Sequence, residues 1–293
     1  RIMAIFVTGD THGSKKLGFF SVDGFMPRLN TESFPEQKNM SKDDFVVILG
    51  DFGGIWNNTE TKEEAYALDW LDSKPFTTLF VPGNHENYDR LTGIDDADVL
   101  NNWMYCKLSD EEKEKLREGF PQKFWHGGMI REIRPSVLML ERGHIFNIDG
   151  CDCFAFGGAR SHDISGGIFH PEKFKTSKQA NAAYKQFEHH ASFRINHLSW
   201  WQQEMPNQKE MQLGKENLKK AHNMVDFIFS HDCPASDKTL LIGPNKLDEL
   251  NVYFEKIKQN TIYKNWFFGH YHDNKRLPGG KDILLYEQIV QIN

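Results

Sequence analysis

Six short apolar runs, rich in β-branched and aromatic residues, constrain the fold of this 293-residue chain more than any other feature. Continuous apolar runs of this length are typical of β-strands that are buried on both faces. Five of the six are followed at once, or within two residues, by a glycine, which predicts a sharp turn where the strand ends. The runs occupy residues 4–7, 45–49, 78–81, 154–156, 227–229 and 266–268.

Helical patterns lie between the apolar runs, at residues 60–71, 109–117 and 247–257. Ser109 precedes three acidic residues, which predicts a helix N-cap followed by an acidic first turn. Strands that alternate with helices indicate an α/β fold with crossover connections. Residues 137–148 and 283–292 resemble β-hairpins, so we expect the sheets to be mixed.

Length and local composition bear on the domain organisation. At about 150 residues per domain the chain could hold two domains. Residues 162–223 are rich in Gln, Lys, Asn and His and contain no strand-like run. We therefore predict one domain over residues 1–293 with a mostly helical insertion at about 162–223. Trp200 and Trp201 are expected to anchor the insertion, and Phe19 and Phe20 are candidates for the rim of a site.

Charge and cysteine content exclude several function classes. The net charge of −6 argues against a surface that grips an extended nucleic acid. No apolar run approaches the roughly 20 residues of a membrane span. The four cysteines form neither a CxxC pair nor a secreted-type disulfide framework, so a reducing cytoplasm is the expected location.

Metal-binding side chains follow five of the six apolar runs. Ligands of open α/β sheets bind beyond the carboxyl ends of the strands. Where two such residues are spaced by two, both side chains leave the strand end in the same direction and can reach one centre. The five blocks are Asp10-Thr11-His12, Gly50-Asp51, Gly83-Asn84-His85-Glu86, His231 and Gly269-His270-Tyr271-His272.

The donor types in these blocks indicate which metals could bind. Two carboxylates, one amide oxygen and four imidazoles suit Mn²⁺, Fe²⁺/Fe³⁺ or Zn²⁺ and are too rich in nitrogen for Ca²⁺ or Mg²⁺ alone. Seven donors exceed the need of one tetrahedral ion, whereas one shared carboxylate would give each of two ions four ligands. Two ions about 3.5–4 Å apart can activate a bridging water and clamp a phosphoryl group.

The five blocks, in this order, resemble the calcineurin-like metallophosphoesterases, which include the Ser/Thr protein phosphatases. The pattern of that superfamily is D-x-H, G-D, G-N-H-D/E, a single H and G-H-x-H, and here it extends from Asp10 to His272. The resemblance implies a four-layer α-β-β-α sandwich of two mixed β-sheets flanked by helices.

The resemblance also implies roles for the site residues. Asp10, His12 and His272 would hold the first metal, Asn84, His231 and His270 the second, and Asp51 would bridge both. His85 matches a histidine that binds no metal, stabilises charge on the phosphoryl oxygens and protonates the leaving group. The nucleophile would be the hydroxide that bridges the two metals.

The sequence departs from the protein-phosphatase branch after Asp51. That branch continues to an Asp and an Arg that orient the catalytic histidine and bind phosphate, whereas here Phe52-Gly53-Gly54-Ile55-Trp56 follows. Arg160 is the candidate replacement for substrate binding. It lies in Gly157-Gly158-Ala159-Arg160-Ser161, which resembles a segment of bacterial and phage members of the superfamily.

The predicted function is metal-dependent phosphoester hydrolysis at a dinuclear centre. The leading hypothesis is a phosphomonoesterase, which includes the protein-phosphatase type. The expected substrate is a small molecule, a phosphoprotein or a nucleotide, and no membrane or extended nucleic acid is expected as a partner. Two alternatives remain open. One is a phosphodiesterase acting on nucleotides or nucleic-acid ends, and the other is an inactive binding platform of the same fold.

Overall fold

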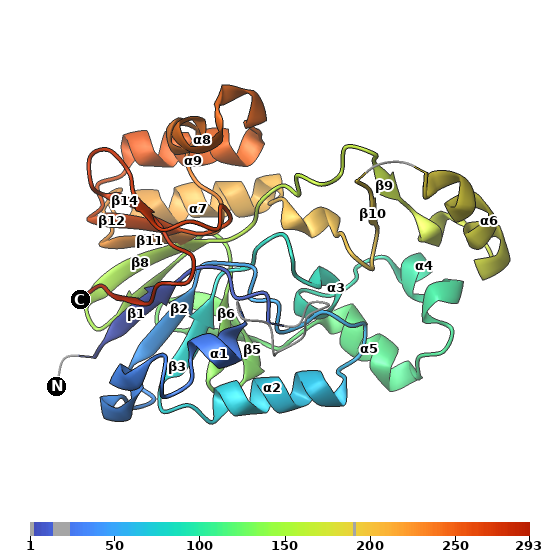
Figure 1. Cartoon of the computed structure of the whole chain (residues 1–293), viewed down its shortest axis with the longest axis horizontal. Coiled ribbons are helices and arrows are strands. Elements are labelled where there is room, and N and C mark those ends of the chain that lie inside the picture. Colours follow the sequence, from blue (N-terminus) through green and yellow to red (C-terminus); the bar gives the residue numbers. More distant parts are fainter. Residues whose placement is uncertain (1–2, 14–23, 190–191) are drawn as a thin grey trace.

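Two mixed β-sheets form the centre of the chain in the computed structural model, which describes residues 3–13, 24–189 and 192–293 (Figure 1). Phe19 and Phe20 lie outside these described residues. The first sheet has the order β15 (Val290–Gln291), β1 (Ile5–Thr8), β2 (Phe45–Ile48), β3 (Thr77–Phe80), β6 (Val137–Leu140), β5 (Gly128–Arg134) and β4 (Gln122–Trp125). The second has the order β13 (Lys275–Arg276), β14 (Asp282–Leu284), β12 (Asn265–Phe268), β11 (Phe227–Ser230), β8 (Cys151–Phe156) and β7 (His144–Ile148).

The six apolar runs form the strands β1, β2, β3, β8, β11 and β12, as predicted. Strands β1, β2, β3 and β6 are parallel to one another, and so are β14, β12, β11 and β8. The remaining strands of both sheets pair antiparallel at the edges, which confirms that the sheets are mixed.

The two predicted hairpins, at residues 137–148 and 283–292, are wrong. Strand β6 pairs in the first sheet and β7 in the second, so the chain changes sheets at residues 141–143. Strands β14 and β15 likewise belong to different sheets. Apolar residues of all these segments face one shared core, and apolar periodicity does not distinguish a hairpin from a change of sheet.

The main core lies between the two sheets. Ile5 and Val7 of β1 pack in the same cluster as Phe227 and Phe229 of β11, and Phe6 points to the opposite face of the first sheet. This alternation follows from the period of two along a strand. Because both faces of each sheet are covered, the central strands are buried along their length.

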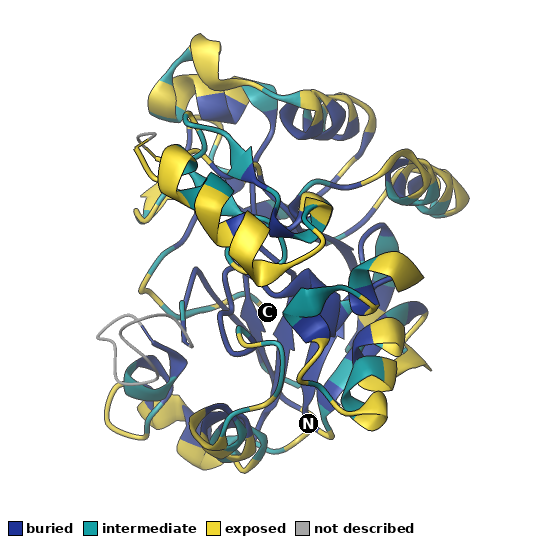
Figure 2. Cartoon of the chain, turned by 90° about the vertical axis from the view of Figure 1, so that its right-hand side faces the viewer, coloured by how far each residue is buried: buried dark blue, intermediate teal, exposed yellow. Residues whose placement is uncertain are grey.

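Helices cover the outer face of each sheet, so the predicted four-layer α-β-β-α sandwich is confirmed. Leu68 and Leu71 pack on the first sheet, and Leu218 and Phe254 on the second. Figure 2 shows buried residues concentrated on the strands and exposed residues on the outward helix faces. The flanking helices are α1 (Phe25–Arg28) and α2 (Lys62–Asp72) on the first sheet, and α7 (Gln208–Lys220), α8 (Ala235–Ile242) and α9 (Glu249–Asn260) on the second.

The three predicted helical patterns correspond to α2, α5 (Asp110–Glu118) and α9. Ser109 caps α5 through a capping box with Glu112, as its position before an acidic turn predicts. Helices α3 (Tyr88–Leu91) and α4 (Ala97–Leu100) have four residues each, too few to give a periodic pattern. The 3-10 helices are η2 (Pro35–Asn39), η3 (Trp103–Tyr105), η4 (Pro171–Lys173), η5 (Gln202–Glu204) and η6 (Pro244–Lys246).

Residues 162–223 contain an outlying part and a part that joins the sandwich. The short parallel strands β9 (Ile168–Phe169) and β10 (Arg194–Ile195) lie with α6 (Ser177–Phe187) at one end of the molecule (Figure 1). Helix α7, by contrast, packs directly on the second sheet. The division into one domain with an insertion at about 162–223 stays a prediction.

No helix among the described residues has the length and apolar character needed to cross a membrane.

Candidate metal centre

Five loops at the carboxyl ends of strands bring the predicted ligands together. Strands β1, β2 and β3 run parallel in the first sheet, as do β11 and β12 in the second, so their loops open at one edge of each sheet. The two edges meet, since the His231 ring binds the Leu49 carbonyl oxygen through Nδ1 at 2.7 Å. The sequence blocks are thus far apart in the chain but adjacent in space.

Asp10, His12 and His272 form a first group of possible metal ligands. His272 Nε2 lies 3.1 Å from Asp10 Oδ2 and 2.9 Å from His12 Nε2. Two donors that bind one metal at about 2.0–2.2 Å are separated by about 3.3–3.6 Å at the tetrahedral angle and by about 2.8–3.1 Å at 90°. The spacing of this group therefore fits one ion.

Asp10, Asp51 and His231 form a second group, which shares Asp10 with the first. His231 Nε2 lies 3.3 Å from Asp51 Oδ1 and 3.2 Å from Asn84 Oδ1, so the Asn84 amide belongs to this cluster as well. Asp51 Oδ2 lies 3.7 Å from Nδ1 of His12 in the first group. Asp51 therefore stands between the two groups of donors.

His270 and His85 lie beside these groups without belonging to either. The His270 ring centroid is 4.9 Å from that of His231, and its backbone N–H donates to Asp10 Oδ1 at 2.9 Å. The backbone N–H of His85 donates to Asp51 Oδ1 at 2.8 Å, and its Nε2 lies 3.9 Å from Asp51 Oδ2. The His85 ring is thereby held against the cluster.

The glycines of the blocks are needed because ligand side chains occupy the space that a Cβ would take. A Cβ on Gly83 would lie 2.1 Å from Asp51 Oδ1, and one on Gly269 would lie 2.2 Å from Asp10 Oδ1. A Cβ on Gly50 would lie 2.2 Å from His231 Nδ1. Each of these three glycines thus makes room for a ligand from a different block.

We expect Gly83→Ala to disrupt metal binding and lower the melting temperature, with a stability cost of about 1–3 kcal/mol, because the new methyl group collides with Asp51. Thermal unfolding and metal titration of the purified variant measure both effects. Gly150→Ala is the control, since that position has φ 78° but nothing within 4 Å of a Cβ. It should lower stability through its backbone alone and keep metal binding; a Gly83→Ala variant that binds metal normally would contradict this explanation.

Four residues of the cluster have left-handed backbone conformations that non-glycine residues rarely adopt. The φ angles are 45° for His12, 44° for Asp51, 72° for His270 and 50° for His272. Such conformations cost about 1–3 kcal/mol each and persist only where the surroundings enforce them. Their concentration here indicates a functional site.

Glu86 holds the strained loop after Asp51. Its buried carboxylate accepts hydrogen bonds from the backbone N–H groups of Phe52 at 2.7 Å and Gly53 at 3.3 Å. Burial, together with the nearby Asp51 charge, raises the pKa of Glu86 to about 8. Sequence reasoning gave Glu86 no role, although its position next to His85 was a signal.

Two buried carboxylates bring negative charge into the cluster. Asp10 and Asp51 are 0% and 2% exposed, and within the described part of the chain the cationic side chains within 4.0 Å of them are all histidines. Burial is the largest single influence and opposes their ionisation, yet His231 and the other neighbouring histidines together outweigh it and hold the pKa of both carboxyls below the usual range. The donor set therefore fits a cation, and mixed oxygen and nitrogen donors suit a transition metal.

Metal binding to the metal-free protein should release at least one proton per chain near neutral pH. Burial alone would lower the pKa of His231, but Asp51 and Asp10 raise it to about 10. Because Nδ1 of His231 faces the Leu49 carbonyl, Nε2 must lose its proton to bind a metal. The apparent affinity for the metal should rise about tenfold per pH unit for each proton released, until about pH 10.

Calorimetry in two buffers of different ionisation enthalpy measures this release. Binding without any proton release near pH 7 would contradict the assignment of His231 Nε2 as a metal donor.

Arg160 is not part of the cluster. Its side chain is 47% exposed, and its guanidinium donates to the two Glu249 carboxylate oxygens at 2.9 and 2.8 Å. It lines a cavity of about 800 Å³ together with His197 and Trp200. A role of Arg160 in substrate binding stays a prediction.

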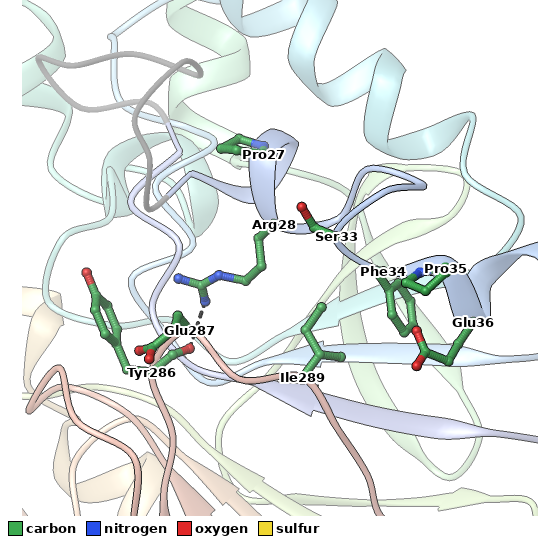
Figure 3. Close-up of a pocket in the computed structure, with 9 residues that line it drawn as sticks. All are labelled: Pro27, Arg28, Ser33, Phe34, Pro35, Glu36, Tyr286, Glu287 and Ile289. Atoms are coloured by element: carbon green, nitrogen blue, oxygen red, sulfur yellow. Dashed lines mark hydrogen bonds between the residues drawn. The ribbon is translucent and has the colours of Figure 1, made fainter.

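Arg28 and Tyr286, which sequence reasoning missed, support the exposed side of the first group. The buried Arg28 guanidinium donates to the carbonyl oxygens of Gly9 at 3.0 Å and Tyr286 at 2.9 Å. The Tyr286 ring stacks on His272 at 4.6 Å between centroids. Both residues line a cavity of about 480 Å³ (Figure 3). No local motif marks them, because Arg28 meets Tyr286 across 258 residues of chain.

Comparison with a protein-family model agrees with the geometry. A sequence model described as calcineurin-like phosphoesterase matches residues 3–274. Among solved structures, the chain is similar to a phosphopantetheinyl hydrolase from Mycobacterium tuberculosis, with 13% identity and a TM-score of 0.39 over 99% of this chain and 95% of that chain. No curated protein matches the sequence.

Proposed function

Because this chain belongs to the calcineurin-like phosphoesterase family and is a metal-dependent phosphoester hydrolase, we propose that it hydrolyses phosphomonoesters at a dinuclear metal centre. One observation carries the dinuclear part of this proposal. The two groups of possible ligands share Asp10, and Asp51 reaches toward donors of both groups. A single ion does not account for so many converging donors.

The proposed ligand assignment follows the sequence blocks. Asp10, His12 and His272 would hold one ion, Asn84, His231 and His270 would hold the other, and Asp51 would be shared between them. When bound, the two ions would polarise the phosphoryl group and activate a water. The donor set favours Mn²⁺, Fe²⁺/Fe³⁺ or Zn²⁺.

His85 acts on the substrate rather than on the metals in this proposal. Its ring lies beside Asp51 and makes an edge contact with His12 at 5.7 Å between centroids. From there the imidazole donates a hydrogen bond to a phosphoryl oxygen and gives a proton to the leaving alkoxide. Such a proton matters most for monoesters and diesters whose leaving group is a poor one.

A panel of phosphoesters with Mn²⁺ tests the proposed specificity. It contains p-nitrophenyl phosphate, its bis ester, phosphopeptides, nucleotides and cyclic nucleotides, each also assayed with metal-free protein. We expect the highest kcat/KM for a monoester and no turnover without metal. Higher kcat/KM for the diesters would instead make the enzyme a phosphodiesterase, and hydrolysis of none of them would overturn the proposal.

The same panel tests Arg160, which we propose as a phosphate-binding residue. Its guanidinium is charged, exposed and paired with Glu249, and a phosphate would compete with that carboxylate. Arg160→Ala should raise KM, whereas unchanged kinetics with every substrate would remove Arg160 from the site.

A further inference from the structure

A buried polar chain connects the 3-10 helix η5 with the candidate ligand Asn84. Asn84 and Ser161 are each 2% exposed, and Glu204 is 1% exposed. The Glu204 carboxylate accepts from Ser161 twice, from the backbone N–H at 2.9 Å and from the hydroxyl at 2.6 Å. Ser161 Oγ in turn lies 3.4 Å from Asn84 Nδ2. These hydrogen-bonded side chains thus extend from η5 to the edge of the cluster of candidate metal ligands.

The chemistry of the carboxylate sets the direction of every hydrogen bond in this chain. Burial raises the pKa of Glu204 to about 7. Above that pH the carboxylate is ionised and only accepts, so the single hydroxyl proton of Ser161 is committed to Glu204. Toward Asn84, the Ser161 oxygen can then only accept. The Asn84 amide must present its NH₂ group to Ser161, and its Oδ1 is turned to the opposite side, where His231 Nε2 lies 3.2 Å away.

We propose that Glu204 is a positioning residue that acts through Ser161 to fix the Asn84 amide with its oxygen toward the metals. The inference rests on the proposed metal centre, in which Asn84 is a ligand of one ion. An amide can bind a metal through its oxygen and not through its NH₂ group, so its orientation decides whether Asn84 is a ligand at all. Partners of this kind are known to tune metal affinity.

The position of Glu204 is itself fixed by hydrogen bonds from Arg142 to the backbone of η5. The buried Arg142 guanidinium donates to the Gln203 carbonyl at 2.7 Å and to Tyr88 Oη at 2.8 Å. Tyr88 Oη donates to the carbonyl of Gly83, the residue before Asn84, at 2.6 Å. The backbone of η5 and the loop that carries Asn84 are therefore held by the same guanidinium. This rigidity lets a side chain from η5 set the orientation of an amide in another loop.

Glu204→Gln should reverse the direction of the hydrogen bonds that lead from residue 204 through Ser161 to Asn84. The substitution nearly preserves the shape of the side chain. If the Gln oxygen accepts from the Ser161 backbone N–H, its NH₂ group faces Ser161 Oγ, which must then accept. The Ser161 proton is released toward Asn84 and favours the flipped amide, with NH₂ toward the metals. We expect one of two Mn²⁺ ions to bind about 10–100-fold more weakly, and the other to bind as in the wild-type protein.

Mn²⁺ titration of the full chain by calorimetry, with thermal unfolding beside it, tests the inference at a pH above the Glu204 pKa of about 7. Ser161→Ala, which removes the hydroxyl, should weaken the same ion in the same direction. Glu172→Gln is the matched control, a half-buried carboxylate at η4 that accepts from His170 and Asn196. It should leave both affinities unchanged.

A double-substitution cycle separates orientation from structural support. In an Asn84→Asp background both side-chain oxygens are acceptors, so the added effect of Glu204→Gln on Mn²⁺ affinity should disappear. Wild-type protein that binds fewer than two Mn²⁺ would contradict the proposed metal centre itself. With two bound in the wild type, the inference is overturned if Glu204→Gln changes only the melting temperature, or if its effect persists beside Asn84→Asp.

Discussion

Replacing His85 with alanine should lower kcat for phosphomonoesters with a poor leaving group, such as alkyl phosphates, by about 10²–10⁴-fold while both metals remain bound. His85 stands beside Asp51 without joining either ligand group, so its loss removes a proton donor and no metal donor. Its backbone N–H, which binds Asp51 Oδ1, is kept in the variant. The effect should therefore appear in turnover and not in metal content.

Steady-state kinetics and metal analysis of the same preparation measure the two quantities. His144→Ala is a suitable control, because His144 is a partly buried histidine of β7 in the second sheet. It should change neither quantity. If His85→Ala instead loses a metal, His85 is a ligand and its proposed acid role is wrong.

Asp51→Asn should weaken both metals together, by at least about 100-fold, and abolish measurable turnover. The substitution removes one of two buried negative charges and replaces a carboxylate oxygen that faces His12 or His231 with an NH₂ group. Loss of a direct ligand should exceed the 10–100-fold effects of residues that only support ligands.

Asp89→Asn provides a matched control for this variant. Asp89 is also fully buried and also pairs with a histidine, His197 at 2.8 Å, but it stands outside both ligand groups. Its substitution should lower stability and leave Mn²⁺ affinity intact. If Asp51→Asn weakens one ion and not the other, Asp51 does not bridge the two.

Periodicity in the sequence predicts the central strands well, because each is buried on both faces and reads as a continuous apolar run. It fails at β6 and β7, since the choice between a hairpin and a change of sheet is made by contacts distant in the sequence. It also misses α3 and α4, where four residues give no period. Capping chemistry is more local, and Ser109 was predicted for that reason.

The candidate ligands could be predicted because each belongs to a short block at a strand end. The residues that support these ligands could not be predicted from the sequence. Glu204 reaches Ser161 across 43 residues, and Arg28 meets Gly9 and Tyr286 through backbone carbonyls that carry no sequence signal. Arg160 was predicted from a local resemblance, but its pairing with Glu249, 89 residues away, could be found only in three dimensions.

Anomalous X-ray diffraction from crystals of the Mn²⁺-loaded protein would locate the metals directly. We expect two manganese peaks, one among Asp10, His12 and His272 and the other among Asn84, His231 and His270, with Asp51 in contact with both. A single peak in this cluster, or two peaks without a shared Asp51, would contradict the dinuclear centre proposed for this phosphoesterase.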